Sequence, residues 1–267
     1  MKRREFVVAS ALASLGVGAG ALSLAGMSPA HDDGPVRHRR RGVRKILIAG
    51  GGFNTAFIRY MAQLTGKTRP KLLYLPTASA DKPGNWLKNC AGLDVEASIQ
   101  DSFIGSYKQT RRWDEVLLSA DGIVASGGNT LNQQAIWHAQ GIDVILREAW
   151  NRGIVLGGAS AGSLCWFEEG TTDSRPQELS TVKCLGFLKG SHCPHYDKEA
   201  LRRPLYLKLV GSGRMKPGYA CHNDAGIYFE DNAVKRVVHT REDARVFHVS
   251  AVRGLAVERE LPAEMIA

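Results

Sequence analysis

The sequence contains few cysteines, and their spacing is not that of a disulfide-rich protein. There are five, an odd number, and no two of them form a C-x-x-C pair. They are Cys90, Cys165, Cys184, Cys193 and Cys221. A disulfide framework needs an even set at short spacings. We therefore expect reduced, buried thiols, with one bridge among the last four as the open alternative.

A strongly hydrophobic run is also lacking. The most apolar stretch, residues 7–27, is rich in Gly and Ala and therefore only mildly hydrophobic. It follows the pair Arg3-Arg4 and ends in Ser28-Pro29-Ala30, with small residues at −3 and −1 of a cut after Ala30. This pattern resembles a twin-arginine export signal. We expect residues 1–30 to direct export to the periplasm or beyond, without stable membrane insertion after cleavage; a retained anchor is the alternative.

Acidic residues are scarce only near the N-terminus. The formal net charge is +9, but residues 1–45 hold nine Lys or Arg and three acidic residues, which leaves +3 for the other 222. No aromatic residues are interleaved with the run His38-Arg39-Arg40-Arg41. The charge therefore does not indicate nucleic-acid binding, and we expect residues 31–44 to be a basic linker before one domain at 45–267.

Past the linker, short apolar runs alternate with segments of helical spacing. Strands are expected at 45–49, 71–75, within 95–103, at 122–125 and at 154–156, and helices at 55–64, 86–93, 113–118, 131–139 and 142–151. Such alternation predicts an α/β fold with a mostly parallel sheet covered on both faces. The glycine-rich stop at 50–52 lacks the third glycine of a dinucleotide-binding fingerprint, so we do not expect a nucleotide cofactor.

The most informative segment is residues 157–162, GGASAG, directly after the apolar strand. It places Ser160 in a G-x-S-x-G motif, where small residues allow a sharp strand-to-helix turn under an exposed hydroxyl. The N–H groups at the start of the following helix would face the same point and stabilise an oxyanion. A glycine-rich turn with an incidental serine is the alternative.

A nucleophilic serine needs a base, and the base needs an orienting group. His192 and His195 are the candidate bases, and Pro194 favours His195 because it makes the preceding backbone rigid. The candidate orienting carboxylates are Glu168, Glu169, Asp173 and Asp197. A metal site built on His192 and His195, with Cys193, Asp197 or the segment 222–224, is a rival interpretation that the intervening proline disfavours.

Taken together, four motifs resemble the peptidase E and cyanophycinase family of serine peptidases over about residues 45 to 250. They are 126–130 (SGGNT), 158–168 (GASAGSLCWFE), 171–174 (TTDS) and 190–197 (GSHCPHYD). The resemblance implies a three-layer α/β/α sandwich related to class I glutamine amidotransferases. The segment 220–226, ACHNDAG, departs from the family by being less acidic than expected.

The resemblance also implies roles for individual residues. Ser160 would be the nucleophile, His195 the base and Asp173 the third member, although Glu168 and Glu169 stay open for that role. Gly128 and Ala161 would donate N–H groups to the oxyanion. Known members favour aspartate beside the cleaved bond, so we expect peptide substrates, with Asn129, Arg202 and Arg203 as candidate substrate-binding residues.

Acyl transfer of this kind requires no metal and no organic cofactor. Two other functions stay open: an esterase of the α/β-hydrolase type, which would need a His-Gly oxyanion motif that is absent before the serine, and a catalytically silent binding module. The sequence leaves the oligomeric state open, with a homodimer as one option.

Overall fold

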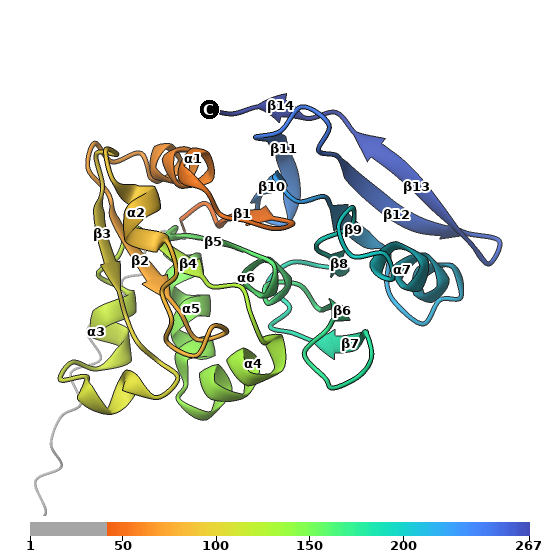
Figure 1. Ribbon diagram of the computed structural model, residues 1–267. Helices are drawn as coiled ribbons and strands as arrows, with labels where there is room; N and C mark the ends of the chain where they lie inside the picture. The colour runs from red at the N-terminus through yellow and green to blue at the C-terminus, as the bar shows by residue number, and fades with distance from the viewer. Residues whose placement is uncertain (1–41) are drawn as a thin grey trace, which may run out of the picture. The chain divides into compact units, whose positions relative to one another are not determined.

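The computed structural model describes residues 42–267, which belong to one compact unit (Figure 1). The predicted export signal at 1–30 and most of the predicted linker lie outside the described residues. Residues 42–44, the end of that linker, contact the domain: the Gly42 N–H donates to the Asn151 carbonyl, and the Arg44 guanidinium lies over the Trp150 ring.

The first sheet has eight strands in the order β14-β11-β10-β1-β5-β4-β2-β3. Its parallel part holds β1 (Lys45–Ala49), β5 (Val155–Ala159), β4 (Gly122–Ala125), β2 (Lys71–Leu75) and β3 (Glu96–Ile99). Antiparallel pairings then add β10 (Ala225–Glu230) beside β1 and β11 (Ala233–His239) beside β10, and β14 (Glu264–Met265) closes the edge.

Helices cover both faces of this sheet because alternate strand residues point to opposite sides. Ile46 and Ile48 of β1 lie in one buried cluster with α3 (Trp113–Leu117), α4 (Thr130–Ala139) and α5 (Ile142–Asn151). Leu47 and Ala49 lie in a second cluster with α1 (Thr55–Thr65) and α2 (Trp86–Cys90). The predicted α/β/α sandwich with a mostly parallel sheet is confirmed, and the predicted elements between 45 and 156 match the observed ones within a few residues (Figure 1).

A second sheet, which the sequence patterns do not predict, follows in the C-terminal half. Its order is β13-β12-β9-β8-β6-β7. The strands are β6 (Glu169–Thr172), β7 (Ser180–Lys183), β8 (Ser191–Cys193), β9 (Gly218–Cys221), β12 (Val246–Val252) and β13 (Leu255–Leu261). Helix α7 (Arg202–Gly211) packs on it through Tyr206, Leu209 and Val210, around Cys193 and Ala220. A 3-10 turn, η1 (Gly105–Lys108), lies near the other end of the molecule, after β3.

All five cysteines lie within residues 42–267 and are free thiols, four of them buried and Cys184 half-buried. Burial raises the pKa of each: that of Cys90 to about 11 and that of Cys184 to about 12. Thiols held neutral in this way are poor nucleophiles. In the same described region, none of the helices combines the length and apolar character needed to cross a bilayer.

Candidate active site

The turn after β5 has the geometry of a nucleophile elbow. Ser160 has φ 58° and ψ −121°, a backbone conformation that residues other than glycine rarely adopt. Helix α6 (Ala161–Leu164) starts at the next residue. The turn packs tightly on the end of β4. A Cβ at Gly162 would lie 2.0 Å from the Ala125 carbonyl oxygen, so no larger residue fits there. The strained serine is held in place by this packing.

The Ser160 hydroxyl contacts an imidazole. Ser160 Oγ lies 2.7 Å from His195 Nε2, a distance typical of a strong hydrogen bond. His195 follows β8 of the second sheet and is itself at φ 55°. Its backbone N–H donates to the Gly50 carbonyl just past β1. The structure therefore brings together two of the predicted catalytic residues, which are 35 positions apart in the chain.

The other ring nitrogen of His195 is held by an amide. His195 Nδ1 lies 2.8 Å from Asn223 Oδ1. Because an amide oxygen only accepts hydrogen bonds, Nδ1 carries the ring proton. Nε2 of the neutral ring is then free to accept the Ser160 proton. Asn223 is thus placed to orient the imidazole, and the three residues form a hydrogen-bonded Ser160–His195–Asn223 relay.

The backbone of Asn223 is fixed by two charged side chains. Its N–H donates to Asp197 Oδ1 over 2.8 Å, and its carbonyl accepts from Arg241 Nη2 over 3.2 Å. Arg241 Nη2 also donates to Asp197 Oδ2, so the three groups form a closed cluster. Asp197, which the sequence offered as an orienting carboxylate, therefore supports Asn223 rather than the imidazole.

Sheet order explains why these groups converge. The strands β10, β1 and β5 are neighbours, and β10 runs antiparallel to the other two. The segment before β10, which holds Asn223, therefore lies at the same edge as the carboxyl ends of β1 and β5. An Asp224 N–H to Gly51 carbonyl bond of 3.1 Å joins the two segments directly. In the sequence, the indication of a role for Asn223 is that it lies in the segment 220–226, which is less acidic than expected for the family.

The predicted orienting carboxylates lie elsewhere. Asp173 has an exposed side chain, and its Oδ1 lies 3.4 Å from Arg202 Nη2. Glu168 accepts from the Gly190 N–H, and Glu169 pairs with Lys183 over 2.5 Å. None of these carboxylates accepts a hydrogen bond from His195 Nδ1, because the single proton on Nδ1 is donated to Asn223 Oδ1. The turn after β6 directs Asp173 away from the imidazole.

The glycine loop after β4 lies beside Ser160. A Cβ at Gly127 would be 3.3 Å from Ser160 Cβ. Within residues 42–267, neither Gly127 nor Gly128 donates its N–H to another group. Ala161 is the first residue of α6, so its N–H has no partner within the helix. Gly128 and Ala161 are therefore both available as oxyanion donors.

The predicted substrate-binding residues are engaged within the protein. Asn129 caps α4: its Oδ1 accepts from the Asn132 N–H, and its Nδ2 donates to the Ser174 carbonyl. Arg202 is only 2% exposed, and it donates to Glu199 and to the Thr171 carbonyl.

Arg203 is half-exposed and bonded to Glu258 over 2.7 Å. It lines a separate cavity together with Asp197 and Glu199. None of these three predicted residues therefore offers an unpaired charge to a substrate carboxylate.

His192, the other candidate base, is a buried structural residue. It is fully enclosed, its Nδ1 donates to the Tyr219 carbonyl, and its Nε2 lies 3.0 Å from Ser163 Oγ in α6. Burial lowers its pKa from 6.5 to about 3. His192 therefore stays neutral and supports the elbow helix from the second sheet.

The depressed pKa of His192 predicts an acid-sensitive stability. Between pH 6.5 and about 3 the unfolded chain binds a proton that the native state excludes, so the unfolding free energy falls as pH falls through this window. One such group contributes at most about 1.4 kcal/mol per pH unit. Urea unfolding from pH 7 to pH 4.5 is expected to show a shallower pH slope for His192→Gln than for the wild type. Equal slopes would contradict this assignment.

The comparison with protein families bears on this geometry. The model of peptidase family S51 matches residues 46–237, which include Ser160, His195 and Asn223. The chain belongs to peptidase family S51. This is the peptidase E family, as the sequence motifs predicted, and its membership supports peptidase activity.

Relatives of this S51 chain agree with the assignment. The uncharacterized peptidase YgaJ of Bacillus subtilis (strain 168) is 35% identical over 227 residues, which cover 83% of this chain and 98% of YgaJ. Two crystal structures share the fold at 16% identity. The structure of a peptidase from an acI-B1 Actinobacterium matches with a TM-score of 0.64. The match covers 84% of this chain and 96% of the actinobacterial chain. A putative peptidase E protein from Listeria monocytogenes EGD-e has a TM-score of 0.57 and covers 75% and 100%.

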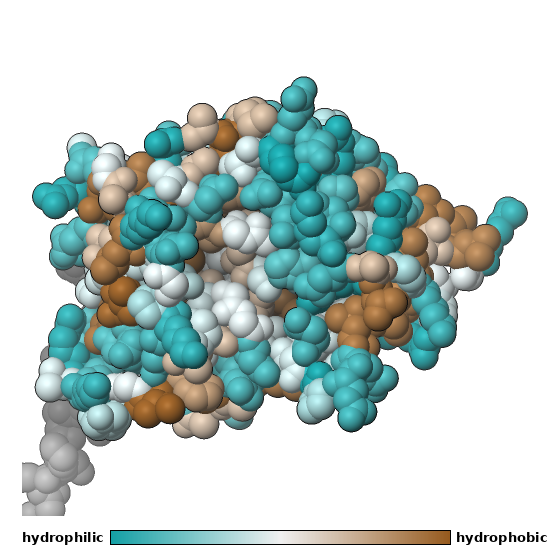
Figure 2. All heavy atoms as spheres, in the orientation of Figure 1, coloured by the Kyte–Doolittle hydropathy of each residue, from teal (hydrophilic) through white to brown (hydrophobic). Residues whose placement is uncertain are grey.

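In this member of family S51, a cavity of about 250 Å³ borders Ser160, and Gly127 is also part of its wall. Figure 2 shows a paler area of intermediate hydropathy in the middle of one face, over the region of β5 and α6 in Figure 1, with hydrophilic residues around it. Across residues 42–267 there is no group of three or more His, Cys, Asp or Glu side chains placed to hold a metal ion.

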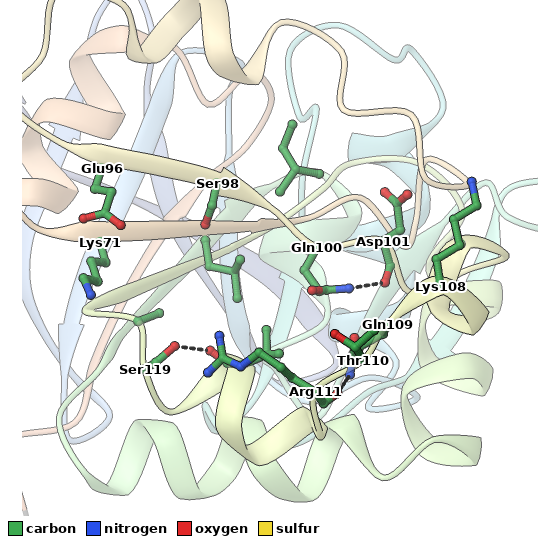
Figure 3. Close-up of a pocket in the computed structure, with 15 residues that line it drawn as sticks. Lys71, Glu96, Ser98, Gln100, Asp101, Lys108, Gln109, Thr110, Arg111 and Ser119 are labelled. Atoms are coloured by element: carbon green, nitrogen blue, oxygen red, sulfur yellow. Dashed lines mark hydrogen bonds between the residues drawn. The ribbon is translucent and has the colours of Figure 1, made fainter.

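A larger cavity, of about 680 Å³, lies away from the elbow at the outer edge of the first sheet (Figure 3). It is lined by side chains of β3 and of the segment 105–111, with both signs of charge: Lys71, Lys108 and Arg111 against Glu96 and Asp101. None of the residues of the Ser160–His195–Asn223 relay lines it. Size alone therefore does not mark the catalytic site here.

Proposed function

We propose that this protein is a serine-type peptidase that cleaves short peptides through an acyl-enzyme on Ser160. The main support is the continuous series of hydrogen bonds from Ser160 Oγ through His195 to Asn223. These residues lie at the edge of the sheet to which the glycine loop after β4 also belongs. The cavity beside Ser160, about 250 Å³, has room for one side chain of such a peptide.

The relay supports a two-step acyl transfer. His195 Nε2 takes the Ser160 proton as Oγ attacks the peptide carbonyl, and the N–H groups of Gly128 and Ala161 stabilise the oxyanion. His195 then gives that proton to the leaving amine, and water resolves the ester by the same route. Asn223 keeps the imidazole in the required tautomer without adding a negative charge.

A fluorophosphonate probe tests the nucleophile directly. Ser160 Oγ would attack phosphorus, fluoride would leave, and peptide mass spectrometry would locate the adduct. We expect one adduct per chain, on Ser160, and strongly reduced labelling in His195→Ala. An adduct on another serine, or no adduct, would contradict the proposal.

Substrate comparison separates a peptidase from an esterase. We expect hydrolysis of dipeptides with a second-order rate constant well above background, whereas an esterase would hydrolyse only p-nitrophenyl esters. A protein that binds peptides and returns them intact would be the silent binding module instead.

We also propose that residues 1–30 are a twin-arginine export signal. The paired arginines, the mildly hydrophobic run and the small residues before position 31 support this, and so do buried free thiols, which are compatible with folding in a reducing compartment. We expect Arg3→Lys/Arg4→Lys to retain the full-length chain in the cytoplasmic fraction, measured by immunoblot. Unchanged export of that variant would refute the route.

A further inference from the structure

The cavity beside Ser160 is lined by uncharged groups. Its walls carry three aromatic side chains, Phe53, Tyr74 and Trp86, and two asparagines, Asn85 and Asn89. The remaining lining residues are small, and within the described chain none of the lining side chains carries a charge. Its chemistry therefore differs from what the family's preference for aspartate requires.

Two of these rings, Tyr74 and Trp86, lie against each other in the wall of the cavity. Trp86 Nε1 donates to the Ser98 carbonyl over 3.1 Å, and the Tyr74 hydroxyl lies close enough to Ser126 for that residue to affect its pKa. The two rings stack with centroids 4.9 Å apart and planes 11° apart. Burial raises the pKa of Tyr74 to about 12, so the phenol stays neutral. The rings can therefore offer apolar surface to a ligand and no charge.

A carboxylate in this cavity would meet only the neutral amides of Asn85 and Asn89 and no cation. Moving an ionised group out of water without a cation or a full set of donors is strongly unfavourable. The two arginines that sequence reasoning offered are used elsewhere, Arg202 inside the protein and Arg203 on Glu258. An aromatic or large aliphatic side chain would instead gain apolar contact and ring stacking.

The position of the cavity identifies which side of the scissile bond it serves. His195 must reach the leaving nitrogen to protonate it, so the leaving group lies on the imidazole side of Ser160. The cavity is bordered by Ser160 and by Gly127 of the glycine loop, whereas neither His195 nor Asn223 lines it. It therefore lies on the acyl side.

We propose that this cavity binds the side chain on the acyl side of the cleaved bond and selects an aromatic or large aliphatic residue over aspartate. The inference rests on the proposed peptidase function and deepens it. The juxtaposition that carries it is an uncharged aromatic wall directly continuous with the nucleophile.

The first test is a matched set of peptides X-Leu and Ala-X-Leu-Ala in which X is Phe, Leu, Ala or Asp, with cleavage after X followed by mass spectrometry. We expect kcat/KM for Phe to exceed that for Asp by at least about 100-fold. Equal or higher kcat/KM for Asp would overturn the proposal.

The second test adds a cation at the cavity. Asn85 is exposed, and its side chain makes no capping bond to α2, so Asn85→Arg is compatible with the fold. We expect it to raise the Asp-to-Phe ratio of kcat/KM at least about tenfold. Leu87→Arg adds the same charge two residues further on, within α2, at an exposed side chain outside the cavity lining, and should leave the ratio unchanged.

Fluorophosphonate labelling of Ser160 in the wild type, Asn85→Arg and Leu87→Arg distinguishes a failure of the proposed function from a failure of the proposed specificity. Without labelling, the proposed function itself fails. Labelling together with cleavage that favours Asp, or with a ratio that Asn85→Arg does not move, refutes only the specificity.

Discussion

Replacing Ser160 by alanine is expected to lower kcat for peptide hydrolysis by about 10⁴- to 10⁶-fold, the range seen when the nucleophile of a serine relay is removed. The loss follows because His195 Nε2 would face a methyl group and no acyl-enzyme could form. His195→Ala is expected to be similarly inactive, and the double variant no worse, because the residues act as one unit.

Ser163→Ala is the matched control for Ser160→Ala. Ser163 lies three residues further along the same turn, and its hydroxyl contacts the Ser160 carbonyl and His192, not the reacting atoms. We expect Ser163→Ala to retain kcat within about tenfold, with some loss of stability. If Ser160→Ala kept kcat within about tenfold of the wild type, Ser160 would not be the nucleophile.

Replacing Gly51 by alanine is expected to lower kcat by about 10²- to 10³-fold, the scale of a misplaced catalytic group. A Cβ there would lie 2.2 Å from Asn223 Oδ1 and 2.7 Å from His195 Nδ1. Those two atoms form the bond that orients the imidazole, so at least one side chain must move. Asn223→Ala is expected to show a comparable or smaller defect, because it removes the acceptor without displacing the ring.

Gly66→Ala separates this effect from ordinary glycine strain. Gly66 caps α1 at φ 70°, and a Cβ there would meet nothing within 4 Å. We expect Gly66→Ala to cost about 1 kcal/mol of stability and to leave kcat unchanged. Circular dichroism and urea unfolding should show that Gly51→Ala remains folded. Full activity in Gly51→Ala would mean that the Nδ1 bond to Asn223 is dispensable.

Local patterns were sufficient for the five parallel strands of the first sheet and for the elbow, but not for the antiparallel strands β10 and β11 or for the edge strand β14. The strands at 45–49, 122–125 and 155–159 are buried on both faces, so they appear in the sequence as short, mostly apolar runs, with glycines in or just after them. The G-x-S-x-G turn can be predicted from its own residues, because small residues are required wherever the backbone passes this close to a neighbouring strand.

The orienting residue depends on information that is not local. Asn223 reaches His195 only because β10 pairs antiparallel with β1, a partner about 180 residues earlier in the chain. Asp173 was favoured by its place after two threonines, but a short turn aims its carboxylate at Arg202. The second sheet was missed because β6, β7, β8 and β9 have only three or four residues each, and because β13, although longer, has mostly exposed residues.

The chain crosses from one sheet to the other at Asn223, between the end of β9 and the start of β10. Ser160 is carried by the first sheet and His195 by the second, so the reacting pair spans a seam between two separately hydrogen-bonded layers. If the two sheets shift relative to each other, each can keep its own backbone hydrogen bonds. The distance between Ser160 Oγ and His195 Nε2, however, changes with even a small shift. We therefore expect hydrolysis by the proposed relay to be lost on heating before the secondary structure melts.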